Sequence, residues 1–387
     1  MAWLMNRVEN IFAALEHNDR VCSVNLTNIP SWHTEKVLAA MQKPFPALTY
    51  LQLHFLYEKT PVDPALFLGG SAPSLETLVL SYVPFPGLPS LLLSATYLVN
   101  LTLWRIPHSG YISPEAVVTC LSVLTRLKSL EIGFESPRRY PDRNSLGLPP
   151  QTRALLPVLT RLCFRGDSEY LEDLVARIDA PLLDFLDTMF FHQLIFDAPQ
   201  LTQFISRTPG LKAHEEARLI FSTHWSVSVA VPRIFYGALK LGISCRQSNL
   251  LASSMAQVHG SSFPQALIPT VECLYILEDP YRAQLLELHW QDDIENAQWL
   301  ELLHPFTGVR DLYISQELVS HIAPALQELV GERVAEVLPA LETLSLEETL
   351  PSGPDQEAIG EFLAARQLAN HPISVSLWEG NHFNLRI

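Results

Sequence analysis

Apolar residues recur along the chain in one spacing: an apolar residue, two others, a second apolar residue, one other and a third. Leu75, Leu78 and Leu80 are an example, and Pro73 stands two residues before them. The copies begin at Leu48, Leu75, Leu98, Leu127, Leu159, Val271, Val309 and Leu341. The first five copies are separated by 27, 23, 29 and 32 residues. A spacing that returns in this way predicts a repeat protein.

Each interval has room for one short strand and one helix, which is the unit of a leucine-rich repeat. Alternation along a strand turns Leu78 and Leu80 to one face, and Val79 and Ser81 to the other. We expect all eight first positions to lie in strands of one curved, largely parallel sheet, with helices on its convex side. The predicted fold class is α/β, a leucine-rich-repeat-like solenoid, with residues 1–387 as a single domain.

Apolar residues at helical spacing predict the helices between the strands. Leu171, Leu174, Val175 and Ile178 fall on one face of such a helix, and Ser168 is its expected N-cap. The recurrent proline ends each incoming helix before the next strand. Other helices are expected at about 9–17, 34–42, 114–123, 199–207, 249–258, 281–289, 295–303, 317–330 and 355–369.

Residues 210–265 depart from the recurring spacing. The runs Arg218–Phe221, Val227–Val231 and Leu239–Cys245 alternate as strands do, but they lie closer together than one per repeat. We therefore expect a locally irregular sheet in this region. Segments 136–150 and 351–355 contain several prolines and are expected to be surface loops rather than domain linkers.

Charge and cysteine content narrow the possible functions. The chain has 26 Lys and Arg against 41 Asp and Glu, a net charge of −15, which repels nucleic acid and anionic lipid. It contains no apolar stretch of the roughly 18 residues that a membrane span needs and no signal peptide, so we expect a cytoplasmic or nuclear protein. The cysteines are far apart and mostly in apolar runs, which predicts buried, reduced thiols: Cys22, Cys120, Cys163, Cys245 and Cys273.

The residue spacings that are typical of catalysis or metal binding are absent from the sequence. It has no phosphate-binding glycine loop, no nucleophile elbow and no paired-histidine or paired-cysteine ligand motif. The nearest approach to a metal cluster is His289, Asp292, Asp293 and Glu295, a group more typical of a helix end followed by a polar cap. We expect no enzymatic activity, no cofactor and no metal.

Three phrases carry a closer resemblance: ALEHNDRV at 14–21, SEYLEDLVARIDAPLL at 168–183 and FFHQLIFDAPQLTQFISRTP at 190–209. With them, nearly the whole chain resembles the F-box-like leucine-rich-repeat proteins of mushroom-forming fungi. The resemblance implies the substrate-recognition region of an F-box ubiquitin-ligase receptor. Such relatives carry an F-box before the repeats, and this sequence has no such module ahead of residue 14. We therefore expect that the chain does not bind the ligase adaptor.

The strand residues between and after the ladder leucines point away from the core. They are Gln52 and His54, Val79 and Ser81, Thr102 and Trp104, Glu131 and Gly133, Cys163 and Arg165, Tyr275 and Leu277, Tyr313 and Ser315, and Ser345 and Glu347. Solenoids commonly bind partners on this concave face, and Trp, Tyr and Arg dominate many protein interfaces. The candidate contact residues are Trp104, Arg165, Tyr275 and Tyr313, with His54, Glu131 and Glu347 beside them. Alternatively, the aromatic side chains only pack against one another and cover the sheet.

The sequence as a whole favours a non-enzymatic repeat protein that binds other proteins on its strand face. The partner is an unidentified protein, not a nucleic acid or a membrane. The alternative is a truncated or orphan family member that folds but has a purely structural role, without coupling to a ligase. A coding F-box immediately upstream in the genomic DNA would distinguish the two.

Overall fold

The computed structural model describes residues 11, 13–29, 31–55, 64–83, 88–136, 153–191, 198–211, 216–222, 226–232, 238–244, 270–278, 294–347 and 353–378. Its internal contacts form two compact units. Unit 1 comprises Met1–Phe185 and Arg207–Gly210, and unit 2 comprises Leu186–Ser206 and Leu211–Ile387. The expectation of one domain over 1–387 stays a prediction.

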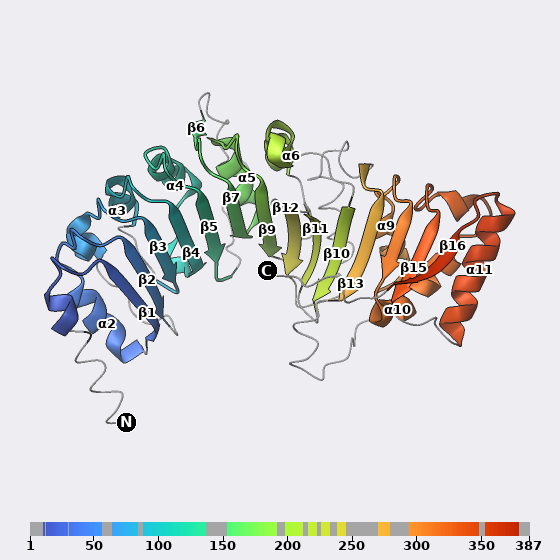
Figure 1. The fold of residues 1–387 in the computed structure, drawn as a ribbon, viewed down its shortest axis with the longest axis horizontal. Coiled ribbons are helices and arrows are strands. Elements are labelled where there is room, and N and C mark those ends of the chain that lie inside the picture. Colours follow the sequence, from blue (N-terminus) through green and yellow to red (C-terminus); the bar gives the residue numbers. More distant parts are fainter. Residues whose placement is uncertain are drawn as a thin grey trace. The chain divides into compact units, whose positions relative to one another are not determined.

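Unit 1 contains a parallel sheet whose strands follow one another in chain order (Figure 1). Its strands are β1 (Ser23–Ile29), β2 (Tyr50–Phe55), β3 (Thr77–Ser81), β4 (Asn100–Ile106), β5 (Ser129–Phe134) and β7 (Arg161–Gly166). The parallel pairing that the recurring spacing predicts is confirmed for each neighbouring pair.

The strand register aligns the recurring leucines into two ladders. One runs through Leu51, Leu78, Leu101, Leu130 and Leu162, and all five side chains are at most 1% exposed. The second runs through Leu53, Leu80, Leu103, Ile132 and Phe164. A one-residue slip would turn every ladder side chain to the opposite face, so burial of the ladders determines the register.

The first residue of each copy does not lie in a strand, and that expectation was wrong. Leu75, for example, precedes the start of β3 by two residues and is fully buried in a turn, where its N–H donates to Ala72 O at 3.2 Å. The next two N–H groups, of Glu76 and Thr77, both donate to Thr49 O in the preceding repeat. Hydrogen bonds from the preceding repeat therefore hold the chain in a turn at this position.

The same turn shows two further copies that the leucine spacing did not reveal. Cys22 O accepts the N–H groups of Thr49 and Tyr50, so a copy begins at Val21. Another begins at Leu183, after which Asp184 and its neighbour donate to the preceding repeat. The first copy carries valine and no proline, and the second has Thr188 at its last ladder position, so neither contains the full phrase.

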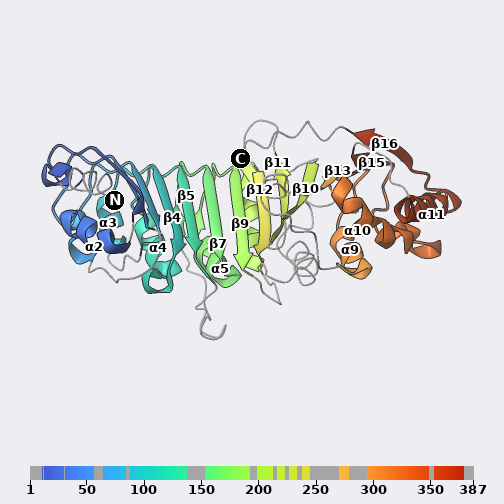
Figure 2. The ribbon, with the colours of Figure 1, turned by 90° about the horizontal axis from the view of Figure 1, so that it is seen from below.

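Helices lie on one side of the unit 1 sheet (Figure 2). They are α2 (Ser31–Ala40), α3 (Leu88–Ser94), α4 (Pro114–Leu121) and α5 (Ser168–Ala176). The unit also contains the 3₁₀ helices η1 (Pro64–Gly70) and η2 (His108–Gly110). Ser113 caps α4 by accepting the N–H of Ala116 at 3.2 Å. The N-cap of α5 is Asp167 rather than Ser168, which is buried as the first helical residue.

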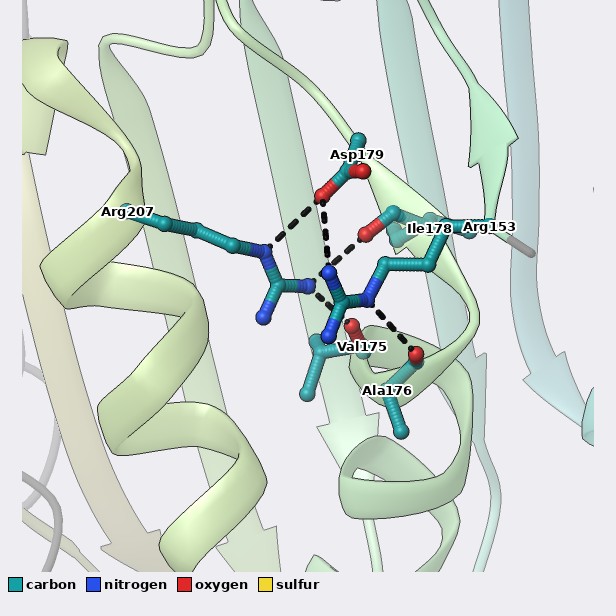
Figure 3. A network of polar contacts seen from close by, with 6 residues as sticks. All are labelled: Arg153, Val175, Ala176, Ile178, Asp179 and Arg207. Carbon is teal, nitrogen blue, oxygen red and sulfur yellow. Dashed lines mark hydrogen bonds and ion pairs between the residues drawn. The ribbon is translucent and has the colours of Figure 1, made fainter. Parts of the chain in front are cut away.

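Two arginines close the carboxyl end of α5 in unit 1 (Figure 3). Nη2 of Arg207 donates to the carbonyls of Val175 and Ile178 at 2.6 and 2.8 Å, and its Nε donates to Asp179 Oδ1 at 2.9 Å. Arg153 Nη1 lies 4.0 Å from the same carboxylate oxygen. Helix ends leave carbonyls without intrahelical partners, and these guanidinium groups supply donors. They also hold β8 (Ile178–Asp179), which pairs with β6 (Ala154–Leu155).

In unit 2 the parallel pattern is interrupted. The sheet order is β9 (Phe185–Phe191), β12 (Ala238–Ser244), β11 (Ser226–Pro232), β10 (Glu216–Ser222), β13 (Cys273–Glu278), β14 (Asp311–Ile314), β15 (Thr343–Glu347) and β16 (Ser374–Trp378). Strand β11 is antiparallel to both β10 and β12, while β10 and β13 to β16 pair in parallel. The three predicted strands and an irregular sheet at 216–244 are therefore confirmed, and residues 245–265 lie outside the described residues.

The α-helices of unit 2 match the predicted ranges closely; they are α6 (Pro199–Arg207), α9 (Asn296–Leu303), α10 (Gln316–Gln327) and α11 (Pro354–Leu368). The short 3₁₀ helices η4 (Pro209–Leu211) and η6 (Gly331–Ala335) were not predicted. Glu295 caps α9 in a capping box, as the polar-cap interpretation predicts. Helix α11 begins inside the segment that was expected to be a loop. The loop at 137–150 and the helices at 249–258 and 281–289 lie outside the described residues.

A fully buried arginine joins the last helix to the preceding repeat. Arg366 of α11 donates from Nη1 to Val334 O and from Nη2 to Leu341 O, both at 3.0 Å. Burial lowers the pKa of this guanidinium. At the last strand, β16, the ladder positions Val375 and Leu377 are 37% and 53% exposed. The leucine ladder is thus covered up to β15 and open at β16.

Candidate protein-binding surface on the strand face

Burial alternates along the strands as the sequence predicts. In β2, Leu51 and Leu53 are buried, whereas Gln52 and His54 between and after them are half-buried. We call the side opposite the leucines the strand face. Six of its predicted members are nevertheless buried: Ser81, Gly133, Cys163, Leu277, Ser315 and Ser345. Most of these residues have small side chains, and larger neighbouring side chains cover some of them.

Trp104 lies over Gly133 in unit 1. A Cβ atom at Gly133 would come within 2.5 Å of Cε3 of the indole, so only glycine lets the ring lie this close to the neighbouring strand. The Trp104 side chain is half-buried. Trp104 is therefore partly packed against the sheet, and its remaining surface is open for contact.

The sequence pattern did not predict a second aromatic group on the strand face. His54 meets the ring of Tyr82 edge-on, with centroids 5.8 Å apart, and the Arg105 guanidinium lies 5.1 Å from the same ring. Arg105 also donates from Nη1 to the Tyr82 hydroxyl. Simple alternation would put Tyr82 and Arg105 on the other side. Both have positive φ, and the register of β4 shifts around Arg105, so a bulge re-aims its side chain.

Glu131 and Arg165 flank this group on the next strands of unit 1. Strand pairing places Glu131 of β5 opposite Cys163, and Arg165 of β7 opposite Gly133. Both charged side chains are half-buried. Gly133, on which the Trp104 ring lies, is therefore next to Arg165 in the sheet. The candidate residues of unit 1 lie on neighbouring strands of this sheet.

Three aromatic rings form one cluster on the strand face of unit 2, which we call the tyrosine patch. Tyr275 and Tyr313 are stacked, with centroids 4.3 Å apart and planes 13° apart. Trp378 meets both edge-on, at 6.2 and 5.9 Å. On the other side, the Arg218 guanidinium lies 5.9 Å from the Tyr275 ring. All four side chains are half-buried.

The sequence revealed Tyr275 and Tyr313 but not Trp378. The last strand lacks an apolar residue at the first position of the phrase, where Pro372 stands, so the pattern did not include this copy. Its indole reaches the tyrosines across β15, because Ser345 of β15 and Ser376 of β16 are small; their hydroxyls share a 2.7 Å hydrogen bond. The mutual packing of the aromatic rings, foreseen as the alternative interpretation, is thus present in this patch.

The last candidate, Glu347, has a structural contact of its own. Its Oε2 accepts the backbone N–H of Gln316 in the first turn of α10, at 3.2 Å. A carboxylate at a helix amino terminus is favoured by the helix dipole. Glu347 therefore helps to position α10 as well as contributing negative charge to the strand face.

Burial and nearby carboxylates shape the electrostatics of the tyrosine patch. Burial and Glu216 raise the pKa of Tyr275, and burial and Asp311 raise that of Tyr313. Burial and Asp311 also raise the pKa of Cys273 to about 11, so its thiol is protonated at neutral pH. Its Sγ lies 3.8 Å from Asp311 Oδ2. A thiol in this environment is a poor nucleophile.

The described cysteines form no disulfide. Cys120 and Cys163 are buried as predicted, Cys273 is half-buried, and Cys22 is exposed, which corrects the expectation for that residue. Burial raises the pKa of Cys120 to about 11. Cys245 lies outside the described residues. Within the described ranges, no group of three or more His, Cys, Asp or Glu side chains is placed to hold a metal ion. None of the helices that the structure describes is long and apolar enough to cross a membrane.

Comparisons with known proteins give little beyond this geometry. No family model matches the chain, and no curated protein matches it. Among solved structures, it is similar to the leucine-rich repeat-containing protein LegL7 from Legionella pneumophila, at 15% sequence identity and a TM-score of 0.34. The alignment covers 88% of this chain and 97% of that one. At this TM-score the likeness carries no argument about function, so the interpretation rests on the chain's own strands and side chains.

Proposed function

We propose that the protein is a non-enzymatic repeat protein that binds another protein on its strand face. The observation that carries the proposal is the contrast between the two sides of the strands. Ladder leucines such as Leu78 are fully buried, whereas Trp104, Arg165, Tyr275 and Tyr313 stay half-exposed on the other side. Tryptophan, tyrosine and arginine contribute most strongly to protein interfaces.

The arrangement also favours binding over a purely structural role for these side chains. Trp104 rests on a glycine and Tyr275 stacks on Tyr313, so little side-chain freedom remains to be lost when a partner binds. Pre-ordered aromatic side chains reduce the entropic cost of association. In this proposal the repeats continue as a solenoid and present the strand face as a concave surface.

The finer proposal, a substrate receptor of a ubiquitin ligase, rests on the sequence resemblance alone. In it, the strand face holds the substrate and the ligase adaptor binds elsewhere in the protein. A binding measurement with purified adaptor tests where docking occurs, and stable binding to the residues of these repeats would place it within them.

The test of strand-face binding is a comparison of bound proteins in extract of the organism that makes the protein. The wild-type chain, a Trp104→Ala/Tyr313→Ala double variant and a Leu368→Ala control are used as baits, with quantitative mass spectrometry. Leu368 is 90% exposed at the end of α11, so its variant removes apolar surface away from the strand face. Proteins that bind wild type and control but are lost from the double variant support the proposal.

Melting temperatures of all three baits are measured as well, and a loss of binding counts as support only where the double variant stays folded at the assay temperature. If the double variant keeps every protein that the wild type binds, the strand face is not the binding surface. A chain that recovers no partner at all would favour the alternative of a structural or orphan protein.

A further inference from the structure

The tyrosine patch contains an internal example of how it accommodates a cation. On β10, Glu216 pairs with Arg218 at 3.2 Å, and the Arg218 guanidinium lies 5.9 Å from the Tyr275 ring. Strand pairing puts Arg218 directly opposite Tyr275. A carboxylate, a cation and a tyrosine ring therefore already act together at one side of the patch, in a geometry suited to a cation–π contact.

On the other side of the patch the carboxylate and the ring are present without the cation. Asp311 stands two residues before Tyr313 on β14, as Glu216 does before Arg218 on β10. Among the described residues, no lysine, arginine or histidine forms an ion pair with Asp311. Within the described ranges, its carboxylate lies 3.8 Å from the protonated thiol of Cys273. The charge of Asp311 is thus not neutralised within the described part of the chain.

Short side chains border Asp311 on the strand face. Strand pairing places Thr343 opposite Asp311 and Ser374 opposite Thr343, so short hydroxyl side chains occupy the next two strands. Ser374 is exposed and Thr343 is half-exposed. A long cationic side chain could lie over these two residues, reach the Asp311 carboxylate and contact the edge of the aromatic cluster.

We propose that the tyrosine patch recognises an arginine or lysine side chain on an extended segment of a partner protein, with Asp311 as its ion-pair partner and Tyr313 as its aromatic contact. The inference rests on the proposed function and specifies the partner's chemistry. Charge complementarity with a cationic side chain supports this proposal. The Asp311 carboxylate is negative, and so is the net charge of −15 on the whole chain. The rise in the pKa of Tyr313 that Asp311 causes, after burial, is consistent with a negative potential at this ring.

The probe is a phage-displayed library of random dodecapeptides, selected on the full chain with a Tyr275→Ala/Tyr313→Ala variant as counter-selection. Enriched peptides are then synthesised with a fluorescent label, and their affinities are measured by fluorescence polarisation. For each peptide, a second version carries citrulline in place of arginine, which keeps the length of the side chain and removes its charge. Where the peptide contains lysine, norleucine replaces it, which keeps the four-carbon chain and removes the charged ammonium group.

Asp311→Asn is the decisive variant, because it keeps the shape of the side chain and removes its charge. Glu357→Gln is the matched control, since it removes one negative charge from an exposed position on α11 of the same unit. We expect the enriched peptides to contain arginine or lysine. Asp311→Asn and the neutral peptide should each weaken binding about five- to thirty-fold, whereas Glu357→Gln should change it less than two-fold.

The two changes should not be additive: once Asp311 is neutral, removing the peptide's charge should cost much less. If Tyr313→Ala unfolds the protein, the Asp311→Asn variant, whose melting curve should be unchanged, still tests whether the ion pair contributes to binding. Peptides that need the tyrosines but bind equally well without a cation would overturn this inference and leave the proposed function standing. A library that yields no peptide dependent on Tyr275 and Tyr313 would count against strand-face binding at this patch and against the inference together.

Discussion

Replacing Leu78 by alanine tests whether the ladder side of the strands is the core. Leu78 is fully buried, and in the sheet it lies between Leu51 and Leu101, which are 0% and 1% exposed. Truncation of a buried leucine costs about 2–5 kcal/mol, more when the surroundings cannot close around the cavity. Paired strands on both sides hold the backbone in place here, so we expect the free energy of unfolding to fall by about 3–5 kcal/mol.

The matched control is Val79→Ala, one residue further along the same strand. Val79 is half-buried on the strand face, so its truncation should cost only about 0.5–1 kcal/mol. Both variants change β3 by small apolar truncations and differ mainly in which side of the sheet they affect. The comparison therefore isolates the assignment of faces.

The assay is urea unfolding followed by circular dichroism, together with amide hydrogen exchange of the β3 amides. Hydrogen exchange is needed because the chain contains two units, which can unfold in separate steps. Leu78→Ala should lower the midpoint and speed exchange in β3 far more than Val79→Ala does. Equal losses for the two variants, or a larger loss for Val79→Ala, would refute the assignment of the leucines to the core.

Three further outcomes follow from contacts elsewhere in the two units. Arg207→Met should lower the free energy of unfolding by about 2–4 kcal/mol, because it leaves two carbonyls at the end of α5 and Asp179 without this donor. Arg207→Lys should recover part of that loss in the same thermal unfolding experiments. No loss in either variant would contradict the role of the network. Gly133→Val should cost about 1–3 kcal/mol by displacing Trp104, and this cost should largely vanish in a Trp104→Ala background if the close contact is its cause. With its pKa raised to about 11, the Cys273 thiol should react with iodoacetamide at a rate that rises about ten-fold per pH unit from pH 7 to 10. Peptide mass spectrometry follows the alkylation. A rate that levels off near pH 9 would show that the thiol is not buried as described.

Most of the fold could be predicted because the ladder spacing is a local property of the chain. In Leu78-Val79-Leu80, alternation alone decides which side chains share a face. The helix at 199–207 was predicted to the residue, since its apolar positions repeat with helical spacing. Even the strands at 216–244 were visible as alternating runs. Their antiparallel pairing was not predicted, although the three and five residues between successive strands are too few for a parallel crossover.

The binding surface depended more on tertiary structure. The sequence placed Trp104, Tyr275 and Tyr313 on the strand face, but only the packing shows that Trp104 rests on a glycine and that the two tyrosines stack. Trp378 joins them from a strand whose copy of the phrase is incomplete.

What the sequence determined by itself is the periodic part: the leucine ladders, the alternation of the two faces and most of the helices, because each depends on residues close together in the chain. Tertiary structure decided the features that depend on contacts between neighbouring repeats. The entry turn at Leu75 exists because N–H groups after it bond to the preceding repeat, and a bulge carries Arg105 to the strand face. Contacts between repeats set these features, and a single repeat does not encode them.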